Sequence, residues 1–276
     1  MKLLTLLMLA LCCGSALADC PTSVPLKGLV TLNHCDAASG KCVRGDKALY
    51  DYMDAVPDAG PATLSISAHG SPWHVFDDNY RIIEIDKLAA TVRQQGSNIK
   101  QVKLVASWSG VAPDSHSSSV AARLSRALGG MPVTGQDGFV WVSQRGALRT
   151  THQAFTARVG GPYWIGQGDD VMASLVPGWA IAMEPEFIKS GDAAGLMRVG
   201  AGKEIFMLCP DGALASFDAS AALNNPVAAF NAAIIRLERG RSGDVRAAML
   251  LLKQAAAQGD QQAADKLQAL AKSRQH

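Results

Sequence analysis

The sequence predicts an α/β fold, with a mainly parallel sheet flanked by helices and a short α-helical hairpin at the C-terminal end. Two observations carry this prediction. Strand-like apolar runs alternate with amphipathic helical runs between residues 62 and 143, which is typical of parallel βαβ units. The last fifty residues instead contain two Ala/Leu-rich runs, each opened by a Gly-Asp pair. Such a pair ends one helix and caps the next.

The individual elements follow from hydrophobic periodicity and from the residues that break it. We expect strands at 28–32, 62–68, 81–85, 101–107, 132–135 and 139–143, and helices at 46–56, 87–95 and 118–130. Residues 144–226 are Gly-rich and show weaker periodicity, so we expect short strands and loops there that complete the domain.

The length and the N-terminus indicate three segments: a signal peptide at 1–18, an α/β domain at 19–226 and a helical tail at 227–276. The first 18 residues hold one Lys, an apolar run and the small-x-small end Ala16-Leu17-Ala18, which is the pattern of a secretory signal. The apolar run is too short for a permanent membrane anchor. We therefore expect an exported protein, periplasmic or extracellular in a bacterium.

Composition excludes some partners. Charged residues make up 18% of the chain and the net charge is +2, without long basic or acidic runs. Nucleic acids and anionic membrane surfaces are therefore not expected partners. We expect a protein or peptide partner, and no cofactor.

Four cysteines remain once the signal peptide is removed, and an even number in an oxidising compartment favours disulfides. Cys35 and Cys42 flank a short Gly- and Ser-containing segment, which favours a local pair and leaves Cys20 for Cys209. The other two pairings stay open. No CxxC or HxxxH spacing occurs, so we expect no metal site.

Chemistry-bearing side chains follow two neighbouring strands of the predicted sheet. His69 and Gly70 end the apolar run of 62–68, and Ser107 ends that of 101–107. Functional groups of parallel sheets collect at the carboxyl ends of the strands, so we expect His69 and Ser107 to share a cleft. Trp73, Trp108 and Ser109 are the nearby candidates for lining it.

The segment from Ala62 to Val142 resembles the caspase-like clan of cysteine peptidases, which includes caspases, gingipains, legumain and the self-processing domains of bacterial toxins. The matching features are "ISAHG", the crossover helix, "LVASWSG", a helix of "SxxxAxxL" texture and "PVTGQDGFVWV". The resemblance implies a catalytic histidine at His69 and a nucleophile at position 107. The C-terminal tail resembles one helical hairpin of a Sel1-like or tetratricopeptide repeat.

Position 107 departs from this clan, because it holds Ser where the clan has Cys. A serine hydroxyl needs a base in direct contact, whereas a thiol is readily ionised. "ASWSG" is also not a G-x-S-x-G elbow. His74, and His116 with Asp114 to orient it, are alternative bases, although a histidine in such a polar loop is usually a solvated surface residue.

Three hypotheses follow for function. The first is a degenerate peptidase that binds a protein or peptide partner. The second is an active hydrolase with Ser107 as nucleophile and His69 as base. The third is a cell-envelope interaction protein that works through its helical tail. It also stays open that Ser107 is an engineered replacement for a natural Cys.

Overall fold

The computed structural model describes residues 59–142, 147–151, 180 and 182–273. The predicted signal peptide, the predicted elements at 28–32 and 46–56, and Cys20, Cys35 and Cys42 lie outside these residues.

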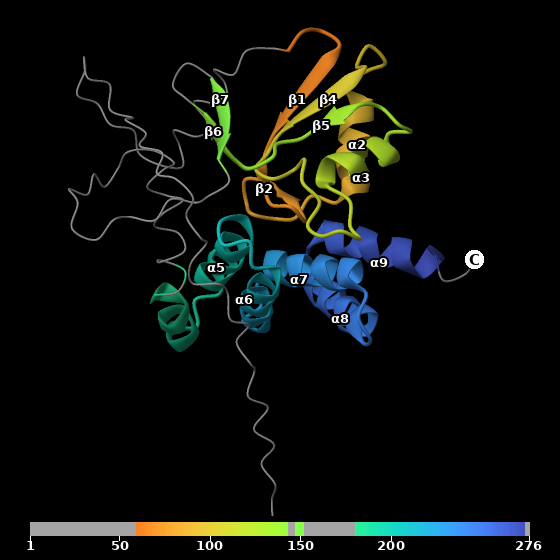
Figure 1. Ribbon diagram of the computed structural model, residues 1–276. Helices are drawn as coiled ribbons and strands as arrows, with labels where there is room; N and C mark the ends of the chain where they lie inside the picture. The colour runs from red at the N-terminus through yellow and green to blue at the C-terminus, as the bar shows by residue number, and fades with distance from the viewer. Residues whose placement is uncertain (1–58, 143–146, 152–179, 181, 274–276) are drawn as a thin grey trace, which may run out of the picture.

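The first part of the described chain is an α/β unit (Figure 1). Its strands are β1 (Thr63–Ser67), β2 (His69–Gly70), β3 (Val75–Phe76), β4 (Gln101–Val105), β5 (Val133–Thr134), β6 (Phe139–Val142) and β7 (Leu148–Thr151). Its helices are α2 (Ile85–Gln94) and α3 (Val120–Ala127).

A three-stranded parallel sheet in the order β1-β4-β5 lies at the centre of this unit. The helix α2 connects β1 to β4 in the chain and α3 connects β4 to β5, which confirms the predicted βαβ units. Of the expected strand at 81–85, only an isolated bridge at Ile82 forms, and Ile85 already begins α2.

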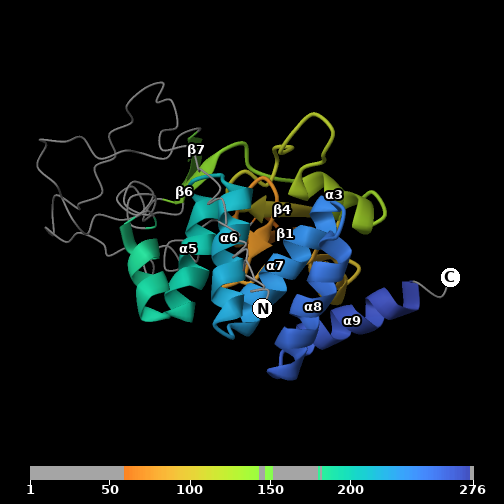
Figure 2. The same cartoon turned by 90° about the horizontal axis from the view of Figure 1, so that it is seen from below.

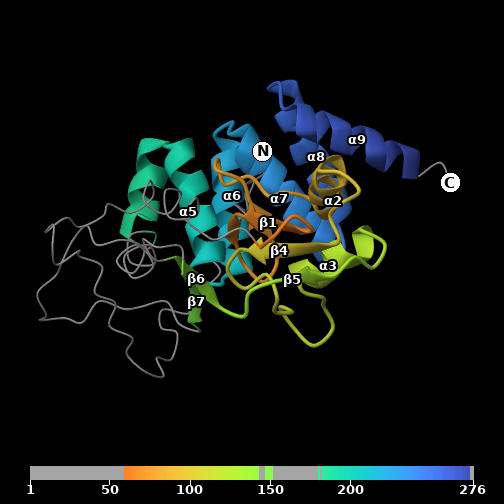
Figure 3. The same cartoon turned by 90° about the horizontal axis from the view of Figure 1, so that it is seen from above.

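The helices α2 and α3 lie beside the sheet (Figure 3), and their apolar side chains pack on it in a single core. The helix α2 buries Leu88 and Val92, and α3 buries Leu124, against Val102 and Leu104 of β4. At i, i+4 spacing, Leu88 and Val92 lie on one face of their helix, as the sequence predicts. Ser119 caps α3 by accepting a hydrogen bond from the Ala122 amide at 3.2 Å.

The second part of the described chain is a stack of helices. A helix at 182–190 is followed by α5 (Ala193–Ile205), α6 (Pro210–Ala222), α7 (Pro226–Arg239), α8 (Asp244–Ala257) and α9 (Gln261–Ser273). The expectation of short strands and loops is therefore wrong for residues 182–222, where helices stand instead. The helical part is larger than the expected hairpin and begins well before residue 227.

Small residues explain why the sequences of α5 and α6 show little of the hydrophobic periodicity that predicts a helix. Gly, Ala and Ser lie around most of their circumference, so neither helix has a distinct polar face. These residues allow close approach: a Cβ at Gly200 would lie 2.6 Å from the Phe217 ring. The α8–α9 hairpin shows the predicted breaks, with Gly243 and Gly259 at φ of 84° and 88°. The Asp260 carboxylate caps α9 by accepting from the Ala263 amide.

The two parts share one core. Phe76 of β3 and Ile82, which follows it, are both 1% exposed and belong to the apolar cluster of the helices. The Asn231 side chain on α7 bonds the Ile82 amide and the Tyr80 carbonyl at 2.9 and 2.8 Å. Figures 1 and 2 place the helices beside the end of the sheet where β1 and β4 finish. Among the described helices, none has the length and apolar character needed to cross a membrane.

The close contact between Gly200 and Phe217 makes a stability prediction. Gly200→Ala forces a methyl group into the buried ring, and overpacking of this kind costs about 1–3 kcal/mol. Phe217→Leu in the same chain provides room, so the double variant should lose less stability than the two single losses added together. Urea unfolding of the four proteins measures this, and strictly additive losses would contradict the contact.

Candidate functional site

The end of β1 and the end of β4 lie side by side, as the sequence predicts. Ser67 of β1 pairs with Val105 of β4, and the Ala68 amide donates to the Val105 carbonyl. Gly70 packs directly on the next strand end: a Cβ there would lie 2.7 Å from the Ser107 carbonyl oxygen and 2.9 Å from the Ala106 Cβ. The backbones that carry His69 and Ser107 are therefore adjacent, and the approach requires a glycine at position 70.

The Ser107 side chain is bound to its own chain. Its Oγ accepts a hydrogen bond of 3.0 Å from the Val140 amide, at the start of β6. The next residue, Trp108, has a left-handed φ of 61°, and its amide donates to the Gly138 carbonyl. A bulky residue at positive φ is strained, so Ser107 sits on a sharp turn that several backbone hydrogen bonds hold in place.

His69 lies under an aromatic ring. It begins the β2–β3 hairpin and stacks on Tyr80, with ring centroids 5.3 Å apart and an interplanar angle of 29°. Burial lowers the pKa of His69 from its ordinary value, because a buried imidazole is harder to charge. At neutral pH this side chain is therefore neutral and able to accept a proton.

The other predicted lining residues have identifiable contacts. Ser109 is buried and donates to the Ala106 carbonyl at 2.7 Å, while it accepts from the Gln136 amide. Trp108 meets Phe139 edge to face at 5.4 Å. Trp73 is half-buried and presents its carbonyl oxygen to the Arg123 guanidinium. Ser109 thus shapes the turn after β4, and Trp73 belongs to the hairpin.

The two alternative histidines have opposite environments. His116 is exposed, and the Asp114 carboxylate accepts a hydrogen bond from the backbone amide of His116 rather than from its imidazole. His74 was expected at the solvated surface, and this expectation is wrong, because only 5% of His74 is exposed. The polar residues near His74 in the sequence did not indicate the helices that cover it.

His74 lies at the centre of a charge cluster, which we define as Ser71, His74, Arg123, Glu204 and Glu238 and which is buried at Ser71, His74 and Glu204 and exposed at Glu238. The His74 Nδ1 lies 2.7 Å from Oε1 of Glu204 on α5, and its Nε2 lies 3.3 Å from Oε2 of Glu238 on α7. Arg123 of α3 also bonds Glu238 at 2.9 Å. The cluster therefore joins the hairpin and α3 of the α/β unit to two helices of the second part.

The order of contacts in the charge cluster excludes a hydrolytic triad. Ser71 Oγ donates to the same Glu204 oxygen, at 2.7 Å, that His74 contacts, and it accepts the His74 amide at 3.0 Å. A triad needs the imidazole between the hydroxyl and the carboxylate, whereas here the carboxylate lies between them. Ser71 thus closes the hairpin turn and helps to hold Glu204.

Electrostatics make His74 a fixed cation. Burial by itself would lower the pKa of His74, but the charge of Glu204 and its hydrogen bond, together with Glu238, raise it to about 10. The Glu238 side chain is 40% exposed, and partial desolvation would raise its pKa, but the bonds to His74 and Arg123 bring it down to about 2. At neutral pH the cluster holds two cations and the Glu238 carboxylate, with Glu204 completely buried beside them.

Sequence reasoning missed Glu204, Glu238 and Arg123. Glu204 lies 130 residues from His74, so no local spacing relates them. The one available signal was the pair Lys203-Glu204 inside the small-residue and apolar run from Val199 to Met207, because charged residues in such runs are normally paired. The side chains of Lys203 and Glu204 are both buried, and the Lys203 Nζ lies 2.6 Å from Oε2 of Glu184.

One of the four cysteines predicted to form disulfides, Cys209, lies in the described part of the chain. Cys209 is 7% exposed at the start of α6, and the other three cysteines lie outside the described residues, so the predicted pairings stay predictions. Within the described ranges, no group of three or more His, Cys, Asp or Glu side chains has an arrangement that would hold a metal ion.

Comparison with known proteins gives one match. Residues 30–150 match a family described as a domain of unknown function (DUF8616). The match covers fewer than half of the 276 residues. It includes both strand ends of the candidate site and leaves out Glu204 and Glu238. No curated protein and no solved structure matches the chain.

The charge cluster predicts a particular dependence of stability on pH. The pKa of His74 is raised on folding, so its contribution is complete below the unfolded value of about 6.5 and is lost as pH rises towards 10. The pKa of Glu238 is lowered, so its contribution is complete above about 4.5 and is lost as pH falls towards 2. Urea unfolding should therefore show falling stability from pH 7 to 10, and His74→Gln should remove much of that slope. Equal slopes in the two proteins would contradict the assignment.

A matched pair of variants tests the burial of Glu204. Glu204→Gln removes the buried charge that faces His74 and should cost about 3 kcal/mol at pH 7. Glu186→Gln makes the same chemical change at an exposed position on the preceding helix, and it should change stability by less than about 0.5 kcal/mol. Similar losses in both variants would show that the cluster contributes nothing specific.

Proposed function

We propose that this chain is an exported, degenerate peptidase-like protein that binds a peptide or protein partner at the carboxyl edge of β1 and β4. The resemblance of Ala62 to Val142 to the caspase-like clan supplies the first support, since it assigns the nucleophile position to Ser107. The exported state follows from the signal-like N-terminus. A degenerate site of this kind keeps the cleft of an enzyme and uses it for recognition.

The hydrogen bond from the Val140 amide to Ser107 Oγ carries the proposal. This bond uses only one of the two lone pairs of the hydroxyl oxygen, but within the described residues no side-chain base accepts the Ser107 proton. An activated serine instead donates its proton to a base in direct contact. Ser107 is thereby suited to holding β6 against the end of β4.

The backbone around Ser107 supports retention of an ancestral site. The left-handed Trp108 and the tight fit of Gly70 on Ser107 are both demanding local arrangements. Strained residues of this kind persist where the surrounding structure holds them in place, and they cluster at functional sites. They support a site whose shape is kept although its nucleophile is replaced.

One observation favours the alternative of an active hydrolase. Burial keeps His69 neutral at physiological pH, which is the protonation state that a general base requires. In that case the Ser107 hydroxyl would donate its proton to His69 when substrate binds.

A fluorophosphonate probe separates the two functions. If the site is degenerate, the probe should label the unaltered chain no more than it labels the Ser107→Ala chain. Labelling of Ser107 that is lost in His69→Ala would overturn the proposal and establish the hydrolase.

Restoring a thiol tests the peptidase-like origin of the site. In Ser107→Cys, a retained electrostatic environment should give a thiol that titrates near or below neutral, measured by the pH dependence of iodoacetamide alkylation. Ser115→Cys, in the exposed loop after β4, is the control and should titrate near 8.5. If the thiol introduced by Ser107→Cys behaves like the control, this would count against the resemblance to the cysteine peptidases.

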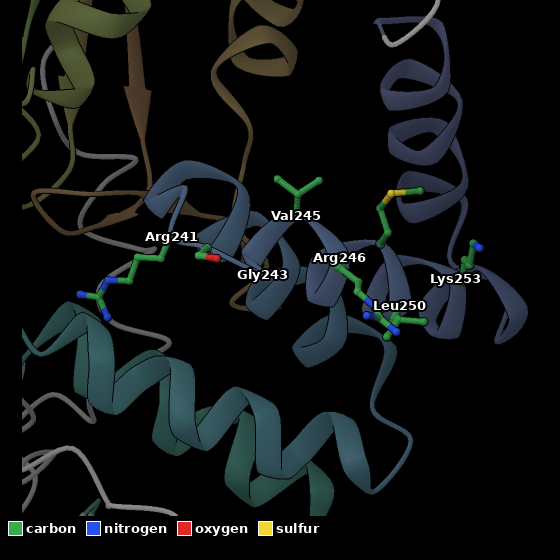
Figure 4. A pocket seen from close by; sticks show the side chains of 8 residues that line it. Arg241, Gly243, Val245, Arg246, Leu250 and Lys253 are labelled. Carbon is green, nitrogen blue, oxygen red and sulfur yellow. The ribbon is translucent and has the colours of Figure 1, made fainter.

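The third function, interaction through the helical tail, has a different support. The helix α8 carries two exposed apolar side chains, Val245 and Leu250 (Figure 4). Deletion of residues 240–276 is no clean test of it, because Ala248 and Leu252 of α8 belong to the helical core. Surface substitutions on α8 avoid that difficulty.

A further inference from the structure

We propose that Tyr80 is a positioning residue of the candidate site, which the helix α7 holds over the imidazole of His69 through Asn231. The proposal rests on the proposed function, because it takes His69 to be part of the surface that meets the partner. It adds to that function the element that controls how the imidazole is presented. Because the Tyr80 ring covers one face of the imidazole, a bound peptide would meet His69 from another side.

Tyr80 has a backbone conformation that its side chain does not favour. Its φ of 56° lies in the left-handed region, where glycine and asparagine are common and a bulky residue is strained. In the described part of the chain, four residues other than glycine have a positive φ, and two of them, Tyr80 and Trp108, are aromatic. Tyr80 stacks on His69 and Trp108 follows Ser107. Strained residues cluster at functional sites, so the strain at both halves of the site indicates that the ring at position 80 serves the site.

Asp77 closes the turn that carries Tyr80. The Tyr80 amide donates to the Asp77 carbonyl at 3.0 Å, and the Asp77 amide donates to the Arg81 carbonyl at 2.9 Å. The Asp77 carboxylate accepts hydrogen bonds from the amides of Asn79 and Arg81, each at 2.9 Å. The left-handed residue therefore lies within a closed set of hydrogen bonds, directly after β3 ends at Phe76.

Asn231 attaches this turn to α7. Its side chain is completely buried, its Nδ2 donates to the Tyr80 carbonyl at 2.8 Å, and its Oδ1 accepts from the Ile82 amide at 2.9 Å. A buried amide side chain is costly unless its polar groups are bonded, so an asparagine in this apolar stretch of α7 is explained by the contact with the turn. Between the two bonded residues, the Arg81 guanidinium pairs with Asp260 at 2.6 Å. The helical part thus holds three consecutive residues of the segment that carries the Tyr80 ring.

The attachment to α7 determines the contact between the rings of Tyr80 and His69. The backbone of His69 is held separately, by pairing with Phe76 across the β2–β3 hairpin. The two ring centroids lie 5.3 Å apart at an interplanar angle of 29°, and burial lowers the pKa of His69. Without the Tyr80 ring, one face of the imidazole would be open to solvent and its side-chain torsions would be less restricted.

Two measurements on the full chain test the proposal. The first is the proton NMR shift of the His69 ring, which the ring current of a stacked tyrosine displaces. The second is the rate at which diethylpyrocarbonate modifies His69, resolved by mass spectrometry, with the exposed His116 as the reference in each protein. Tyr80→Asn suits the left-handed backbone but removes the ring, so the displaced shift should be lost and the rate should rise severalfold. Tyr80→Phe keeps the stack and should reproduce both values of the unaltered chain.

A second set of variants tests whether α7 acts through Tyr80. Asn231→Ala removes the attachment and should also raise the modification rate of His69. Combined with Tyr80→Asn, it should add no further increase, because the ring is then already absent. Asn225→Ala is the matched control, since it removes the side chain that caps α7 without removing a bond to Tyr80, and it should leave the His69 shift and rate unchanged. Circular dichroism confirms that every variant is folded.

Three results would overturn the proposal. One is an unchanged shift and rate of His69 in Tyr80→Asn. Another is an equal effect of Asn231→Ala and Asn225→Ala, because general weakening of α7 would then explain both. The third is an additive increase in the double variant, which would mean that Asn231 acts on His69 by another route. Labelling of Ser107 by fluorophosphonate would overturn the degenerate site instead, and it leaves these measurements of the Tyr80–His69 contact unaffected.

Discussion

The arrangement of the described chain depends on a buried imidazolium held between carboxylates from two helices. His74 brings a positive charge into the contact between the α/β unit and the helical part, where Glu204 on α5 and Glu238 on α7 compensate it. Removing charges from water is expensive, and their attraction offsets the cost only when the geometry is good. The cluster therefore requires the hairpin, α3, α5 and α7 to be in place together. Apolar contacts of Phe76 and Ile82 favour the same docking, while the charges restrict how it can occur.

This docking also positions the candidate site. His69 opens the hairpin that ends near His74, and Tyr80, which stacks on His69, gives its backbone carbonyl to Asn231 of α7. The histidine side of the site is thus supported by the helices, although it belongs to the α/β unit. Ser107, by contrast, is held by Val140 at the start of β6. The two halves of the site therefore have separate supports, and the hydroxyl side is held by the backbone.

The sequence predicted those elements whose determinants are local. The sheet strands β1 and β4, the helices α2 and α3, and the α8–α9 hairpin follow from periodicity, caps and left-handed glycines such as Gly243. The neighbourhood of His69 and Ser107 followed from a general property of parallel sheets. The helices α5 and α6 were missed because small residues occupy most of their faces and leave little periodicity to detect. His74 was misplaced because its burial depends on helices more than 100 residues further along the chain.

Compensation of charge distinguishes the interior of this molecule from the solvent-exposed side of α8. Arg81, 14% exposed, meets Asp260 at 2.6 Å and lies over the Phe230 ring. Lys203 meets Glu184, and Arg123 meets Glu238. Arg81 and Arg123 join elements that are distant in the sequence, whereas Lys203 joins two consecutive helices, and each has a carboxylate partner. Arg246 and Lys253 are exposed on α8 and have no such partner among the described residues. Charged side chains therefore join elements of this fold where they are buried and paired, whereas those of α8 stay in contact with solvent.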